Sequence, residues 1–283
     1  MQDVLTSSPV LLTYCAFVVA VLGLCMGSFL NCLAWRMTHG ESVLHGRSHC
    51  TSCGHALGVR DLVPVLSWLA SRGTCRYCGE RVSVRYPATE VFCAVVYVSL
   101  LLRFGISAEA VEMIAFASVL LVLSLTDLDE YVIPNATIVV AIAIRLAYIA
   151  LQGAMGADAL ALLVQSLVGG FAVAVPVLLL ALIMDHMLGR ESLGGGDVKL
   201  LFVAGLYFGW QQCLFLIVVA CVLGILMGTF GQASKGEPDV ASSSDSDEAT
   251  SHLIPFGPAI ALACWVTMLV GDGVVSWYLS LFL

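Results

Sequence analysis

The sequence predicts an all-α polytopic membrane protein with about eight transmembrane helices and a small polar module on one side of the membrane. Hydrophobic residues make up 60% of the 283 positions and charged residues only 11%, whereas about 25% charged is usual in soluble domains. The charges are also unevenly placed, because residues 36–90 hold 11 of the 32 and residues 232–253 hold six. This composition excludes a soluble enzyme and a disordered protein. The net charge of −8 argues against a nucleic-acid partner and leaves the lipid bilayer as the expected surroundings.

Eight segments are apolar enough to lie in a bilayer, which a helix of about 20 residues can cross. They lie at residues 9–34, 88–104, 111–126, 134–152, 158–184, 197–210, 212–230 and 256–282. The sixth segment is short, and we place its boundary with the seventh at Gln211 and Gln212.

Positive charge orients these helices. Residues 1–8 contain no Lys or Arg, which is unlike a signal peptide, whereas seven arginines follow the first helix. The positive-inside rule places that loop in the cytoplasm and both termini outside. Ten of the twelve basic residues then lie on the cytoplasmic side. Arg103 and Arg145, the exceptions, can snorkel outward from their helices. We therefore expect a multi-pass protein of the cell membrane.

The first polar segment contains two pairs of cysteines with Cys-x-x-Cys spacing. These residues are Cys50, Cys53, Cys75 and Cys78. Such pairs are typical of a tetrahedral zinc site, and a reducing cytoplasm disfavours disulfides. Gly54 and Gly79 follow the pairs and permit tight turns, and a metal supplies stability that a small polar segment lacks. The sequence thus predicts a cytoplasmic zinc-knuckle module. Redox or incidental thiols, and a ligand role for His49 or His55, are the alternatives.

The second polar segment, residues 232–253, is rich in Ser and acids and contains one Lys. It reads as a flexible, solvated cytoplasmic loop. Attraction of a basic partner is the alternative to a plain linker.

Two aspartates stand at the ends of predicted helices. Asp127 follows the third helix, and Asp197 begins the sixth after the glycines at 194–196. The predicted topology brings both to the cytoplasmic face, although they are 70 residues apart. Two neighbouring carboxylates can share a proton, so that one activates a water while the other polarises a carbonyl and protonates the leaving amine. The pair therefore indicates acid protease chemistry.

Each aspartate also has a structural interpretation. Asp197 can cap its helix, Asp127 can be an ordinary interfacial acid, and the residues alone do not choose between Asp127 and Asp129. The rival functions are an ion-coupled transporter and a zinc-stabilised scaffold without catalysis. A transporter needs acids near the bilayer midplane and internal repeats, and the sequence shows neither. A scaffold leaves both aspartate motifs unexplained.

Ordered motifs along almost the whole chain resemble one family, the prepilin peptidases or type IV leader peptidases, which are bacterial Gly-x-Gly-Asp membrane proteases. The motifs are Gly27-Ser28-Phe29-Leu30-Asn31 with Trp35-Arg36, the four cysteines with Arg72-Gly73, Arg85-Tyr86-Pro87 with Glu90, Asp127 with Ile133-Pro134-Asn135, Gly194-Gly195-Gly196-Asp197-Val198-Lys199-Leu200, and Pro255-Phe256-Gly257-Pro258.

The resemblance implies that Asp127, seven residues before Pro134, and Asp197 are the catalytic residues, and that Asp129 is a neighbour. It also implies that type IV prepilins or pseudopilins are the substrates and lose their basic leader at the cytoplasmic membrane face. N-methylation of the new N-terminus with S-adenosylmethionine is expected to follow. We expect a first transmembrane helix at 1–34, a zinc module and candidate methyltransferase part at 35–87, and a protease core at 88–283. The resemblance leaves the S-adenosylmethionine ligands and the oligomeric state unassigned.

The chain departs from the family at three places: Met37 replaces a common proline, Thr51 and Ser52 occupy the first knuckle, and the acidic insert is long. These departures bear on methylation more than on cleavage. Two roles stay open. Lys199 can face Asp197 or lipid headgroups, and Glu90 can serve methyl transfer or pair with an arginine of the loop. Gly23 and Gly27 have the spacing of a helix-packing face.

Overall fold

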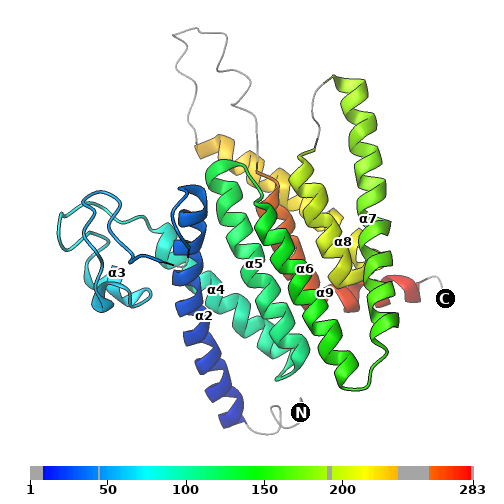
Figure 1. The fold of residues 1–283 in the computed structure, drawn as a ribbon, viewed down its shortest axis with the longest axis horizontal. Helices are drawn as coiled ribbons and strands as arrows, with labels where there is room; N and C mark the ends of the chain where they lie inside the picture. Colours follow the sequence, from blue (N-terminus) through cyan, green and yellow to red (C-terminus); the bar gives the residue numbers. More distant parts are fainter. Residues whose placement is uncertain (1–8, 44, 190–192, 235–254, 282–283) are drawn as a thin grey trace. The chain divides into compact units, whose positions relative to one another are not determined.

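The computed structural model describes residues 9–43, 45–189, 193–234 and 255–281. Within these residues the regular elements are helices (Figure 1). The polar module also contains two isolated β-bridges, which pair His49 with Ala56 and Thr74 with Arg81. In chain order the helices are α2 (Pro9–Thr38), the 3₁₀ turn η1 (Val59–Asp61), α3 (Leu66–Ala70), α4 (Arg85–Phe104), α5 (Ala108–Glu130), α6 (Asn135–Ala154), α7 (Ala159–Leu188), α8 (Gly195–Ser234) and α9 (Gly257–Ser280). The predicted all-α fold is confirmed.

Seven of these helices are long and apolar enough to cross a membrane. Large apolar side chains are exposed along them, for example Phe17 on α2, Val139 on α6 and Ile183 on α7. Exposed apolar surface of this extent is typical of helices that face lipid, because soluble proteins cover such surface. The protein is therefore a membrane protein.

The chain divides into two compact units, residues 1–126 and 127–283. In the first, α2 packs on α4 through the predicted glycine face. A Cβ at Gly23 would lie 2.6 Å from the Cα of Ala94, and one at Gly27 would lie 2.7 Å from the Cα of Glu90. Any larger residue would push the helices apart, so the glycines permit the close approach.

In the second unit, α8 folds back on itself at Gly209, whose φ of 71° and ψ of 173° are not helical. Asp197 before the break and Gly224 after it both lie beside the start of α9. Between them, Gln212 contacts Asp272 in the second half of α9. The sixth and seventh predicted segments are thus the two arms of α8. With this reversal, the seven apolar helices supply the eight crossing segments expected from the sequence.

The segment boundaries differ from the expected ones by a few residues. The reversal in α8 lies at Gly209 rather than at Gln211 and Gln212, because glycine readily adopts the positive φ of the break. Asp127 lies inside the last turn of α5 rather than after the helix. From residue 235 onward, the acidic loop predicted at 232–253 lies outside the described residues, as does the segment 1–8.

Candidate metal centre and aspartate pair

The two cysteine pairs form matching turns in the first unit. In the first turn, the N–H of Gly54 donates to the carbonyl oxygen of Cys50 over 2.8 Å. In the second, the N–H of Gly79 donates to the carbonyl oxygen of Cys75 over 2.9 Å. Both glycines have a positive φ, of 69° and 78°. Each Cys-x-x-Cys-Gly therefore folds as a knuckle that turns both of its thiols to the same side.

The four sulfur atoms of these knuckles converge. All lie within 4.8 Å of one another, and the Sγ atoms of Cys50 and Cys78 are 3.9 Å apart. Thiolates placed tetrahedrally around zinc at about 2.3 Å lie about 3.8 Å from each other, so the cluster fits one such ion. Backbone hydrogen bonds from Cys53 and Ser52 lower the pKa of the Cys50 thiol to about 6, whereas hydrogen bonds with the other thiols help to raise the pKa of Cys78, so the first proton of the cluster is lost most readily from Cys50.

The two histidines near the first knuckle have other contacts. The ring of His55 stacks on Tyr77 with centroids 3.6 Å apart. His49 lies at the edge of Trp35 and 3.9 Å from a carboxylate oxygen of Glu41. The convergent group in the described part of the chain consists of the four cysteines alone, so the alternative of a histidine ligand is not supported.

Asp127 is buried at the end of α5, whereas Asp129 and Glu130 are exposed. Its Oδ2 atom accepts the backbone N–H of Gly257 at 3.0 Å. Gly257 is the first residue of α9 and belongs to the segment Pro255–Pro258, so a motif 130 residues away fixes this carboxylate. This contact could not be predicted from the sequence, because every residue except proline carries a backbone N–H and the donor has no residue-type signature.

Asp197 lies in the first turn of α8, where the helix dipole favours a negative charge. It is not the cap of the helix, which begins two residues earlier at Gly195. Its carboxylate interacts electrostatically with that of Asp127. The pair expected from topology is therefore brought together in the second unit, and Asp129 is not part of it.

Glycine and a lysine join the two aspartate motifs. Gly196 leaves room for Ile133, whose side chain would lie 3.0 Å from a Cβ at that position. The Nζ of Lys199 donates to the Oδ1 of Asn135 at 2.9 Å. Lys199 thus ties the start of α8 to the start of α6.

Comparison with known proteins gives a consistent result. A family model described as the bacterial peptidase A24 N-terminal domain matches residues 21–104, and one described as the type IV leader peptidase family matches residues 114–229. A protein of Myxococcus xanthus is 33% identical over 83% of this chain and 68% of its own length. Proteins of Pseudomonas putida and Bacillus subtilis are 31% and 30% identical, each over 93% of this chain and over 93% and 98% of their own lengths. All three are named prepilin leader peptidase/N-methyltransferase. No solved structure matches the chain.

Proposed function

Because the chain belongs to the type IV leader peptidase family, we propose that it removes the basic leader of type IV prepilins or pseudopilins and methylates the new N-terminus. Asp127 and Asp197 are the catalytic residues of leader removal. The supporting observation is that these two carboxylates, 70 residues apart, interact at one end of the second unit.

The two aspartates have different roles in hydrolysis. One carboxylate takes a proton from a water, whose oxygen attacks the scissile carbonyl carbon. The other, protonated, donates a hydrogen bond to the carbonyl oxygen as charge develops there. When the tetrahedral intermediate collapses, the C–N bond breaks and the leaving nitrogen takes a proton from the pair. The N–H of Gly257 holds the Asp127 carboxylate in place throughout.

The position of the pair suits a substrate with a polar leader and an apolar helix. Asp127 and Asp197 lie at helix ends rather than in the middle of apolar spans. A prepilin can therefore keep its helix in the bilayer and present the leader junction where water is available. The arginine-rich loop supports a bacterial cytoplasmic membrane protein with this end in the cytoplasm and both termini outside.

The second activity belongs to the first unit. The relatives' names couple leader removal to N-methylation, for which S-adenosylmethionine is the methyl donor we propose. The residues around 35–87 form the candidate methyltransferase part, and residues 88–283 form the protease core. Zinc held by the four cysteines stabilises the polar module, because a soft thiolate set of this geometry suits that ion.

Mass spectrometry tests this proposal. The purified full-length protein is incubated with a prepilin peptide and S-adenosylmethionine, alongside the D127N and D197N variants. We expect wild-type protein to yield a leaderless product one methyl heavier than the unmodified mature peptide, and neither variant to yield it. Cleavage by either variant would overturn the assignment of Asp127 and Asp197 as the catalytic pair.

A further inference from the structure

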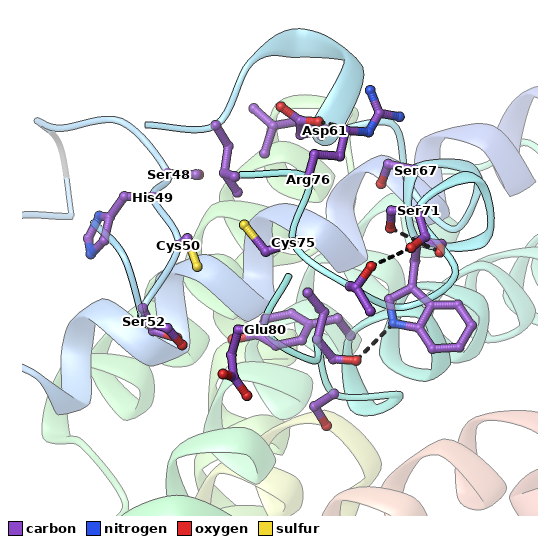
Figure 2. A pocket seen from close by; sticks show the side chains of 18 of the residues that line it. Ser48, His49, Cys50, Ser52, Asp61, Ser67, Ser71, Cys75, Arg76 and Glu80 are labelled. Atoms are coloured by element: carbon purple, nitrogen blue, oxygen red, sulfur yellow. Dashed lines mark hydrogen bonds and ion pairs between the residues drawn. The ribbon is translucent and has the colours of Figure 1, made fainter. Parts of the chain in front are cut away.

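The first unit contains a pocket of about 440 Å³ whose lining includes neither of the two aspartates proposed for peptide hydrolysis. Its walls come from the end of α2, the zinc-knuckle module and the first turns of α4. Figure 2 shows Cys50 and Cys75 pointing toward each other beside it, and Ser67 and Ser71 on another wall. Its volume is that of a typical small-molecule site, and four thiolates around one ion would occupy only one side of it.

The pocket has a buried negative charge. Glu90, in the second turn of α4, lines the pocket and is 7% exposed. Its Oε2 atom accepts the backbone N–H of Val65 at 2.7 Å. No basic group of the described residues pairs with it. A buried carboxylate without a cation is costly, so a cationic ligand would stabilise it.

The pocket also has a buried positive charge. Arg36, near the end of α2, is 8% exposed, and its Nη1 atom donates to the carbonyl oxygen of Ser42 at 3.2 Å. In the described part of the chain, no carboxylate pairs with it. Gly27 packs against Glu90, and nine residues of helix separate Gly27 from Arg36. At 1.5 Å per residue this is about 13 Å along α2, so the two charged side chains start from well-separated points of the backbone.

The backbone beside Glu90 is strained, which indicates that the surrounding structure holds it in a specific conformation. Val65, whose N–H binds Glu90, has a φ of 59°, which is unfavourable for a β-branched residue. Such a conformation is costly and persists only where its surroundings hold it. Just after it, the indole Nε1 of Trp68 donates to the carbonyl oxygen of Val82 at 3.0 Å, which fixes an aromatic wall.

We propose that this pocket is the methyl-transfer site, where Glu90 binds the amine of the newly exposed peptide N-terminus and Arg36 binds the carboxylate of S-adenosylmethionine. The inference rests on the proposed function and assigns residues to its second step. Glu90 suits the amine because it stands on a membrane-spanning helix, where a peptide that continues as an apolar helix would arrive. The aromatic and hydroxyl groups of the walls suit the adenosine of the cofactor.

The chemistry balances with these two partners. Glu90 accepts one proton from the terminal ammonium and frees the nitrogen lone pair. The cofactor supplies a methyl group bonded to a sulfonium. The nitrogen forms a bond to the methyl carbon as the carbon–sulfur bond breaks, and that electron pair stays on sulfur. The products are an N-methylammonium and a neutral thioether, and Glu90 returns its proton to solvent.

The test separates methylation from cleavage by using a synthetic peptide that already begins at the mature N-terminus. Full-length protein is assayed for methylation of this peptide, for binding of S-adenosylmethionine by calorimetry and for leader removal from an intact prepilin. We expect E90Q to lower kcat/KM for methylation at least 30-fold while the Kd for the cofactor changes less than threefold. We expect R36Q to weaken cofactor binding at least tenfold. Glutamine at 90 keeps an oxygen for the Val65 N–H.

Matched variants distinguish a specific loss of function from misfolding. E41Q and R47Q remove the same charges from exposed positions outside the pocket lining, and should leave binding and methylation unchanged. E90D and R36K keep the charges and should recover part of the lost function. Leader removal by the same preparations reports folding and separately tests the peptidase proposal. The inference is overturned if wild-type protein binds no cofactor, if E90Q methylates normally, or if R36Q binds the cofactor normally.

Discussion

The cysteine cluster and the aspartate pair are assembled by different kinds of interaction. The four cysteines come from two short turns of one loop, and each turn is set by its own backbone hydrogen bonds. The aspartates come from the end of α5 and the start of α8, and the N–H that holds one of them comes from the start of α9. The first site therefore depends on local turns and on the zinc that we propose for it, and the second depends on how closely the helices pack.

Because they are assembled differently, the two sites should be disrupted by different changes. Loss of the proposed zinc would remove the main support of a small polar module, because structural zinc supplies folding free energy directly. In the described residues, no comparable group of metal ligands surrounds the aspartate pair. Its geometry follows from contacts such as the one between α7 and α8, where a Cβ at Gly205 would lie 2.6 Å from the carbonyl oxygen of Gly169.

Of three changes that distinguish the two sites, removal of a cysteine ligand should destabilise the protein most. In zinc-finger peptides the metal contributes about 10–16 kcal/mol to folding, so the module of C75S should not hold its structure. We expect elemental analysis to find one zinc per wild-type chain and less than about a tenth of that in C75S. The C25S variant changes an exposed cysteine of α2 and should keep its zinc. Equal zinc in C75S and wild type would contradict the four-cysteine site.

Enlargement of a glycine between helices should have an intermediate effect on the aspartate pair. The added methyl of G205A meets backbone that cannot move aside, and overpacking of this kind costs about 1–3 kcal/mol. We expect a lower thermal midpoint and slower leader removal, with zinc content unchanged. G273A adds the same methyl to α9 in open space and should match wild type in both assays. Normal leader removal by G205A would show that the pair does not depend on this packing.

Loss of the bond between Lys199 and Asn135 should have the smallest effect. Both side chains are exposed, and exposed pairs contribute less than about 1 kcal/mol. We expect N135A to slow leader removal less than about fivefold, and N135D, which keeps an acceptor for the lysine, to recover the rate. A loss of a hundredfold or more in N135A would mean that Asn135 contacts substrate.

The sequence predicted the local features well. The cysteine spacing determines the knuckles, and the glycines after each pair permit the positive φ that both turns adopt. The apolar segments were recognised because a membrane span has a fixed length. Charge placement and helix counting together also predict that Asp127 and Asp197 lie at one end, and in the second unit the two carboxyl groups interact electrostatically.

The sequence does not predict the features that depend on contacts between residues far apart in the chain. The residue type of Gly257 does not indicate that its backbone N–H donates a hydrogen bond to Asp127. The sequence predicts a boundary between two apolar segments at Gln211 and Gln212, whereas the break in α8 lies at Gly209, where glycine adopts a positive φ. The partner of Lys199 and the contact between Glu90 and Val65 likewise join residues that are far apart in the chain.

The central claim is that Asp127 and Asp197 act as one catalytic unit, and a double-mutant cycle tests it most directly. Rates of leader removal are measured for wild type, D127N, D197N and the double variant with one prepilin substrate. Because residues that act as a unit are strongly non-additive, each single change should cost at least about 10³-fold and the double change little more. Two losses that multiply in the double variant, or a single variant with a tenth or more of the wild-type rate, would contradict the account.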